Sequence, residues 1–387
     1  MKKSLVKQEV SVSQRIYSID ALRGMIMLVM LLDHVRGLFY SKKTLAYPIN
    51  VDTTEPFLFW TRWISHFCAP IFIFLTGLAT WLYHQKYQNI QATRLFLLKR
   101  GVFLIMLEFA VCNFYFLYYK SYTMQLQVIW AIGVSMIILS GLLLFPRVIQ
   151  LLLVICLTVL PYIVVQINIP DILWLREIWI VLYQVPAVLH LTDTITIDVL
   201  YPVLPWIAVI YGGYLLGPVF AKNSSPSWRT RMLCAIGGAM ILISIILRLL
   251  NRFGDSNPWT MSADTIRMVM SFLNFSKYPP SVDLLLITIG TGLLLLAAIE
   301  SVSKNANRLI SPFIVLGSVP LFFYVLHLYI ILGAYLLADL FVGGIARSVE
   351  LITVWFITLA LSLGLYPFCK RFSDLKRSSK KPWMSYL

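Results

Sequence analysis

Ionisable side chains stand at both ends of the first apolar stretch of the chain, residues 19–40. Arg23 precedes its uncharged centre, and Asp33, His34 and Arg36 follow it. A stretch of this length and hydrophobicity is typical of a membrane-spanning helix. Because ionisable groups inside such a helix cost free energy, their presence indicates a functional site.

The spacing of these residues places two of them on one helix face. Arg23 and His34 are eleven residues apart, which is close to three full turns and separates them by roughly 16 Å along the helix axis. Asp20 lies on the same stripe. Asp33 and Arg36 are three residues apart, so their charges can neutralise each other. Flanking charges beside a hydrogen-bonded core histidine are the alternative. The clustering of three such groups favours a functional stripe.

Further titratable residues occur in later apolar stretches. Arg62 and His66 are four residues apart, so they share a helix face, at the depth expected for His34. Glu108 and His327 each stand in the middle of an apolar run. For His66, Glu108 and His327 two interpretations stay open, a functional group or a hydrogen-bonded structural one.

The composition is that of an integral membrane protein. Of the 387 residues, 59% are hydrophobic and 13% are charged, and the mean hydropathy is +0.80, whereas soluble domains contain about 25% charged residues. We therefore expect an all-α polytopic membrane protein with about ten transmembrane helices. These helices are predicted at residues 20–40, 62–83, 95–119, 127–145, 147–167, 200–220, 231–251, 282–302, 312–337 and 349–369.

Lysine and arginine set the expected orientation. The predicted inner segments carry roughly twice as many of them as the outer loops, and the positive-inside rule then places both termini in the cytoplasm. We expect a cytoplasmic segment at residues 1–18, one transmembrane domain at residues 19–370 and a solvated, basic cytoplasmic tail at residues 371–387. Arg23 then lies near the cytoplasmic face and His34 lies towards the outer face.

Several classes of function lack support in the sequence. The net charge of +15 is spread over short loops and tails, which indicates anionic lipid and membrane topology, not a nucleic-acid partner. The five cysteines are scattered and predict neither a disulfide framework nor a metal site. P-loop, G-x-S-x-G and H-E-x-x-H patterns are absent from the sequence, so ATP-driven transport and metal-dependent hydrolysis are not indicated.

Two long outer loops, about 168–199 and 252–281, each contain an apolar segment that is re-entrant or interfacial. Loops of this length are often functional, and these two either form a lid over the outer mouth or cap the bundle. The Tyr-Pro-Pro that follows Lys277 is expected to fix the entry into the next helix and to leave Lys277 at the outer interface. For Gly213 and Gly217 we expect a role in helix packing.

Seven motifs carry a resemblance to a known family. In chain order they are RIYSIDALRGMIMLVMLLDHVR, RWISHFCAPIFIFLTG, FLLKRG, QVIWAIG, YPVLPWIAVIYGGYLLG, SKYPPS and VPLFFYVLHL. Together they resemble the bacterial members of the heparan-alpha-glucosaminide N-acetyltransferase catalytic-domain family. The Arg23-to-His34 spacing is also similar to the arginine-x10-histidine element of the wider transmembrane acyltransferases.

This resemblance implies the transfer of an acetyl (acyl) group from cytoplasmic acetyl-CoA, a co-substrate, to a sugar or related acceptor at the extracytoplasmic face. Transfer from a thioester needs a base for the proton of the acceptor and cations or donors for the developing oxyanion. His34 is the predicted base, or the residue that is transiently acylated, with Asp33 beside it. In the lysosomal relatives the position of His34 resembles an asparagine and the key histidine comes later, so His66 stays open as the catalytic histidine.

The remaining candidates bind the two substrates. Arg23 is predicted to hold the phosphates or the pantetheine amides of CoA, and Lys99 and Arg100 are further candidates for the nucleotide phosphates. The predicted acceptor-binding residues are Arg36, Arg62, His327 and Glu108.

A proton-coupled transporter or a lipid-handling membrane protein is the alternative function, because intramembrane Asp, Glu and His also relay protons or bind substrates. The two halves of the chain show no repeat of the kind that many transporters have. We expect the lipid bilayer of a bacterial inner membrane and a glycan or glycolipid acceptor as partners, and neither a metal nor nucleic acid. The acceptor identity, the acyl chain, O- or N-acylation and homodimer formation stay open.

Overall fold

The structure is a computed structural model that describes residues 16–40, 49–114, 123–164, 173–183, 188–190, 192, 196–302, 307–342, 349–379, 381 and 384. Its elements in chain order are α1 (Tyr17–Phe39), α2 (Pro56–Ser65), α3 (Cys68–Tyr87), α4 (Ile90–Leu107), η1 (Glu108–Cys112), β1 (Thr123–Leu126), α6 (Val128–Leu142), α7 (Arg147–Val164), α8 (Leu173–Leu182), β2 (Val188–His190), β3 (Thr196–Val199), α9 (Val203–Leu216), η2 (Gly217–Phe220), α10 (Pro226–Leu250), α11 (Thr265–Leu273), α12 (Val282–Val302), α13 (Asn307–Gly317), α14 (Pro320–Val342) and α15 (Leu351–Ser378).

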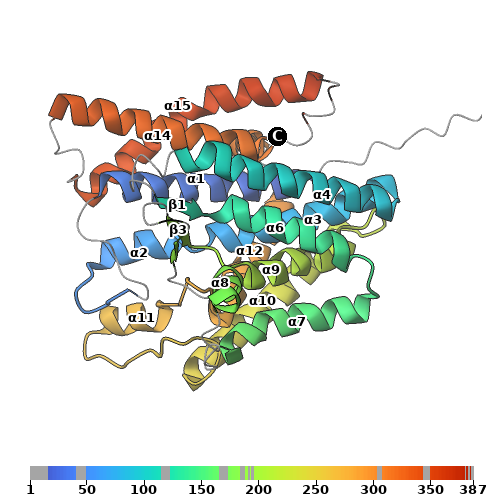
Figure 1. Ribbon diagram of the computed structural model, residues 1–387, viewed down its shortest axis with the longest axis horizontal. Helices are drawn as coiled ribbons and strands as arrows, with labels where there is room; N and C mark the ends of the chain where they lie inside the picture. The colour runs from blue at the N-terminus through green and yellow to red at the C-terminus, as the bar shows by residue number, and fades with distance from the viewer. Residues whose placement is uncertain are drawn as a thin grey trace, which may run out of the picture.

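Most of the long helices run along one common axis (Figure 1). The helix α1, which carries Arg23 and His34, lies inside the bundle and contacts α2, α3, α12, α13, α14 and α15. A single large hydrophobic core includes Leu22, Met27 and Leu31 of α1. We name the two ends of the bundle the Arg23 end and the His34 end, after the positions of these residues on α1.

Each predicted span contains a helix in the described residues, and the eighth has the predicted bounds of 282–302. Residues 115–119 and 165–167, at the ends of the third and fifth predicted spans, lie outside the described residues. Six helical segments of the described chain are long and apolar enough to cross a membrane, which makes this a multi-pass membrane protein. They are Pro56–Tyr87, Val203–Phe220, Pro226–Leu250, Val282–Val302, Pro320–Phe341 and Leu351–Ser378. The helix α1 is not in this set, since it contains four charged residues. The count of ten spans and the cytoplasmic termini stay predictions.

Prolines divide two of the predicted helices. Pro70 has no N–H to donate to the carbonyl of His66, and the second predicted helix is accordingly split into α2 and α3. Pro320 in the same way stands where the ninth predicted helix is split into α13 and α14. Because each break interrupts the helical hydrogen bonding, polar groups near it become available for other contacts.

Glycines permit the closest helix contacts. A Cβ atom on Gly213 would lie 1.9 Å from the carbonyl oxygen of Phe74, and one on Gly217 would lie 2.0 Å from the ring of Trp81. The predicted role of this glycine pair in helix packing is therefore confirmed, between α9, η2 and α3. At Gly24 a Cβ would lie 2.0 Å from the carbonyl oxygen of Phe313, so α1 and α13 also pack backbone against backbone.

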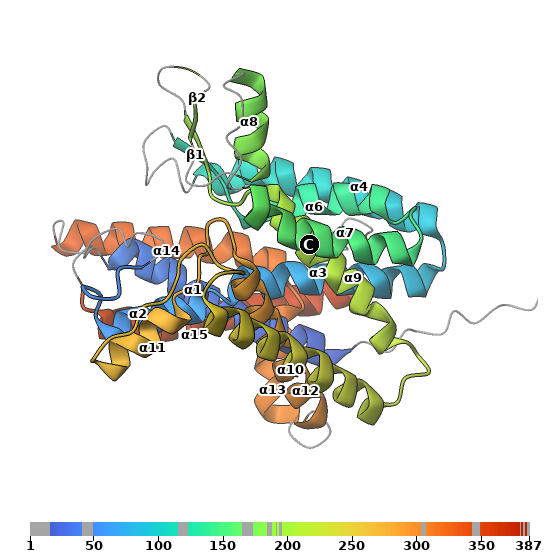
Figure 2. The same cartoon turned by 90° about the horizontal axis from the view of Figure 1, so that it is seen from below.

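The described chain also contains a small sheet that the all-α prediction did not include. Strand β1 pairs with β3 in parallel, with Thr123 opposite Thr196, and β2 pairs with β3 antiparallel. Strands of three or four residues are too short to produce a recognisable alternation in the sequence. Figure 2 shows that α8, β1 and β2 project from the side of the bundle near α4 and α6.

The loop between α10 and α12 is fixed to the bundle by a buried arginine. Arg248 is 2% exposed and donates hydrogen bonds to the carbonyl oxygens of Phe272, Asn257, Ser271 and Asn274. The side chain of Asn274 in turn bonds to both the N–H and the carbonyl of Ile49. These contacts make the loop a cap on the bundle, and they bring the residues that follow it into the interior.

Candidate active site

A cavity of about 590 Å³ lies beside α1 and extends between the two ends of the bundle. This volume is within the range of small-molecule sites, roughly 300–1,000 Å³. Along α3 the wall residues recur at helical spacing, and the 20 residues of α3 are about 30 Å long, close to the ~30 Å of a hydrocarbon core. The wall residues of α3 are Cys68, Ala69, Phe72, Thr76, Ala79, Thr80, Tyr83, Lys86 and Tyr87, and Ser65 at the end of α2 precedes them.

The predicted stripe of α1 forms another side of this cavity. Asp20, Arg23, Met30 and His34 all line it, as the helical spacing predicted. Arg23 and His34 therefore stand at two places along one continuous space. The spacing predicted only that they share a face of α1, and the cavity adds a continuous space between them.

At the His34 end, His34 contacts a histidine from a different helix. The Nδ1 atom of His34 lies 2.8 Å from Nε2 of His327 on α14, and the two ring planes are 13° apart. His327 is fully buried, and its own Nδ1 lies 2.9 Å from the carbonyl oxygen of Phe323. Of this pair, His34 is the one that lines the cavity.

The carboxylate of Asp33 contacts arginines. Oδ1 of Asp33 accepts hydrogen bonds from Arg36 at 3.1 Å and from Arg62 at 2.7 Å. The predicted neutralisation of Asp33 by Arg36 is confirmed, and Arg62 joins it from α2. His66 is 2% exposed and lies behind the wall of the cavity, one residue after Ser65, which lines it.

Lys277, which was expected at the outer interface, is buried in the same part of the cavity. It is 4% exposed, lines the cavity and has its ammonium 5.3 Å from the centre of the Tyr278 ring. It is close enough to Asp33 and His34 for its charge to act on both. Lys277 is buried because Arg248 holds the loop between α10 and α12 against the bundle. The loop then carries the residues just before α12 inward.

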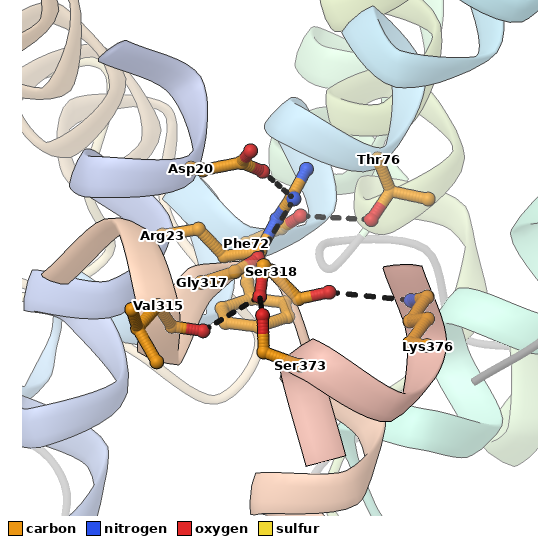
Figure 3. A network of polar contacts seen from close by, with 9 residues as sticks. All are labelled: Asp20, Arg23, Phe72, Thr76, Val315, Gly317, Ser318, Ser373 and Lys376. Atoms are coloured by element: carbon orange, nitrogen blue, oxygen red, sulfur yellow. Dashed lines mark hydrogen bonds and ion pairs between the residues drawn. The ribbon is translucent and has the colours of Figure 1, made fainter. Parts of the chain in front are cut away.

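At the Arg23 end, polar contacts connect α1, α13 and α15 (Figure 3). Arg23 donates to Asp20 at 3.1 Å and to the carbonyl of Gly317 at 3.3 Å. Ser318 pairs with Ser373 at 2.8 Å, and Lys376 donates to the carbonyl of Ser318 at 3.2 Å. All of these except Gly317 line the cavity.

Basic residues from three helices surround this mouth of the cavity. Lys86 of α3, Arg100 of α4, and Lys376 and Arg377 of α15 line it together with Arg23. The tail that was expected to be solvated from residue 371 thus begins inside α15, where Ser373 is 2% exposed. Apolar and polar residues alternate at helical spacing up to residue 378, and that pattern buries one face of the helix against the Ser318 region.

The predicted site residues fall into three groups. Four line the cavity, namely Arg23, Asp33, His34 and Arg100. Four others, Arg36, Arg62, His66 and His327, lie behind its His34 end. The remaining two do not line it. Lys99 is exposed, and Glu108 is fully buried behind Gln127, a residue of the cavity wall whose backbone N–H donates a hydrogen bond to Oε1 of Glu108.

Several residues that line the cavity were not among the site residues predicted from the sequence. Lys277 and Tyr201 occupy its wall, and Lys86, Lys376 and Arg377 occupy its Arg23 end. The usable signal was weak, since Tyr201 and Lys277 each precede an apolar helix, and Lys86, Lys376 and Arg377 stand in the last turns of helices, where basic residues are common. Within the described part of the chain, no three His, Cys, Asp or Glu side chains are grouped as a metal site would require.

A family model matches more than half of the chain. The family described as heparan-alpha-glucosaminide N-acetyltransferase, catalytic, matches residues 15–249. This chain belongs to that family. No curated protein matches the chain. Membership of the heparan-alpha-glucosaminide N-acetyltransferase family gives the protein an acyltransferase-type domain in a multi-pass membrane fold.

The matched region contains α1 to α10 and therefore both Arg23 and His34. The motifs SKYPPS and VPLFFYVLHL lie beyond it, although Lys277 and His327 from these motifs meet His34 in the cavity or beside it. The candidate site is thus completed by residues from the last third of the chain.

Proposed function

We propose that this protein transfers an acetyl group from acetyl-CoA on the cytoplasmic side to a sugar or related acceptor on the opposite side of the membrane. The observation that carries this proposal is the cavity, which connects a basic mouth at the Arg23 end with the imidazole of His34. A donor that stays in the cytosol can then present its acyl group to an acceptor that stays outside. Family membership supports the acyltransferase chemistry.

The Arg23 end suits a nucleotide with several phosphates. Lys86, Arg100, Lys376 and Arg377 surround the mouth, and their charge would attract the phosphates of CoA. Arg23 lies deeper and is oriented by Asp20 and by the carbonyl of Gly317. In this position its guanidinium can donate to an oxygen of the pantetheine arm.

The His34 end suits the transfer itself. The Nε2 atom of His34 takes the proton from the hydroxyl or amine of the acceptor, the acceptor atom bonds to the thioester carbon, and the carbon–sulfur bond breaks. The departing thiolate takes up that proton, so the products are the acetylated acceptor and CoA. The ammonium of Lys277 would stabilise the oxyanion that forms on the carbonyl oxygen.

A second route gives the same products. The Nε2 atom attacks the thioester, CoA leaves as the thiolate, and the acyl-imidazole then passes its acyl group to the acceptor. The proton of the acceptor ends on the thiolate in this route as well. The two routes differ in whether an acylated protein accumulates when acetyl-CoA is supplied without an acceptor.

The test uses the purified protein in liposomes with acetyl-CoA that carries a radiolabel in the acetyl group. We expect the wild type to release CoA thiol and to pass the label to an amino sugar or a glycan. His34→Ala should lower this rate more than 100-fold, consistent with the loss of a general base. His84→Ala is the matched control, since His84 bonds to Thr93 and lies outside the cavity wall.

Two outcomes would contradict the proposal. A His34→Ala variant with the wild-type rate would remove His34 from the chemistry. Uptake of a solute by the liposomes, with acetyl-CoA neither bound nor cleaved, would assign the cavity to a carrier instead.

A further inference from the structure

The contact between His34 and His327 determines which nitrogen of His34 is basic. The two rings come from α1 and α14, 293 positions apart in the chain, and they are joined at 2.8 Å through Nδ1 of His34 and Nε2 of His327. One of these two nitrogens must carry the proton between them. The surroundings of His327 decide which one.

The opposite nitrogen of His327 faces an acceptor. Its Nδ1 lies 2.9 Å from the carbonyl oxygen of Phe323, one turn earlier on α14. A carbonyl oxygen has no proton to give, so this hydrogen bond forms only when Nδ1 of His327 is protonated. A neutral imidazole that donates from one nitrogen accepts at the other.

The surroundings of His327 favour the neutral form of its imidazole. Its side chain is 0% exposed, and its neighbours include the rings of Phe323 and Tyr324. Within the described residues no carboxylate is at ion-pair distance from it, and a buried charge without a counter-ion is costly. Nε2 of His327 therefore accepts, and Nδ1 of His34 donates.

We propose that His327 is a positioning residue that holds His34 in the Nδ1-protonated tautomer and so leaves Nε2 of His34 as the basic nitrogen for the reaction in the cavity. This inference deepens the proposed function and rests on it for the chemistry of His34. The ring of His34 lines the cavity while that of His327 lies behind it, so only His34 can reach a substrate there. The sequence predicted that His327 binds the acceptor. The present proposal instead gives His327 a role that it performs through His34.

The pair serves either route of acyl transfer. In direct transfer, the proton that Nε2 takes from the acceptor makes His34 an imidazolium, which the hydrogen bond to His327 stabilises until Nε2 gives the proton to the thiolate. In the acyl-histidine route, acylation of Nε2 makes the ring of His34 a cation whose Nδ1 proton stays hydrogen-bonded to Nε2 of the neutral His327. The CoA thiolate is the matching anion, and it takes up the proton that the acceptor loses when the acyl group leaves His34, so charge and atoms balance.

The first test reads the tautomer without any change to the pair. The chain has five histidines, so a protein labelled with ¹⁵N-histidine gives few signals, and the spectrum of His34→Ala identifies those of His34. We expect a protonated Nδ1 and an unprotonated Nε2 for His34 at neutral pH. The reverse assignment, with the proton on Nε2, would overturn the inference.

The second test distinguishes a positioning role of His327 from a purely structural one. His327→Phe keeps a ring and removes the acceptor, whereas His327→Gln places an amide oxygen near the position of Nε2. We expect His327→Phe to lower kcat about 100-fold with the KM for acetyl-CoA unchanged, and His327→Gln to restore at least a tenth of the wild-type kcat, in the range of general-base effects. A wild-type kcat for His327→Phe, or equal losses in both variants, would overturn it.

The failure of the proposed function would look different. A protein with the expected tautomer that does not cleave acetyl-CoA would refute acyl transfer while it upholds the histidine pairing. A protein that cleaves acetyl-CoA with the opposite tautomer would uphold acyl transfer and refute the role of His327.

Discussion

Arg62 and Asp33 form an ion pair that joins α2 to α1 directly beside His34. Nη1 of Arg62 lies 2.7 Å from Oδ1 of Asp33, and the arginine side chain is 6% exposed. Arg36 binds the same oxygen from within α1, at 3.1 Å and with a side chain that is 14% exposed. The two arginines therefore contribute differently, although both contact one carboxylate.

Removal of Arg62 should cost much more stability than removal of Arg36. We expect Arg62→Ala to lower the free energy of unfolding by about 3 kcal/mol, because it breaks a buried ion pair between two helices. Arg36→Ala should lower it by about 0.5 kcal/mol, since a more exposed pair three residues apart is weak. Thermal denaturation in detergent measures both. Equal effects would show that the link between helices does not depend on Arg62.

Lys277 should act on the rate of acyl transfer and not on donor binding. We expect Lys277→Met to lower kcat about 100-fold, the usual cost of losing one oxyanion donor, with little change in the KM for acetyl-CoA. Lys277→Arg keeps the charge and is the matched control, for which we expect a smaller loss. Steady-state kinetics distinguish the possibilities. A raised KM at constant kcat would assign Lys277 to substrate binding instead.

The basic mouth should recognise the nucleotide part of CoA. We expect Arg100→Gln to raise the KM for acetyl-CoA about 10-fold and to leave the KM for S-acetylpantetheine, which lacks the nucleotide phosphates, unchanged. Added salt should weaken acetyl-CoA binding in the wild type for the same reason. Lys99→Gln is the control, because Lys99 is the neighbouring cation but is exposed and away from the cavity. An equal loss with both donors would refute phosphate recognition.

A bulky side chain on the wall should close the passage. Ala79 lines the cavity on its α3 side, and we expect Ala79→Trp to abolish transfer from acetyl-CoA while the melting temperature falls by only a few degrees. Gln85→Trp adds the same side chain to an exposed position of α3 that does not line the cavity, and it should retain activity. Full activity in Ala79→Trp would show that the donor reaches His34 by another way.

Local sequence patterns were sufficient to predict the helices and one face of the site. Apolar runs marked the positions of the spans, and the period of an α-helix placed Asp20, Arg23 and His34 on one stripe, which lines the cavity. The pairing of Asp33 with Arg36 followed from the same period. Each of these inferences depends only on residues within a few turns of each other, so no knowledge of the packing was needed.

Long-range packing decided how the site is completed. His327 meets His34 across 293 positions, Lys277 enters the interior because Arg248 fixes a distant loop, and Lys376 reaches the Arg23 end through a helix that was expected to end in solvent. A hydrophobic pattern shows which face of a helix is buried but not which helix covers it. Close approaches such as that of Gly24 to Phe313 select the partner helices, and those contacts exist only in the folded chain.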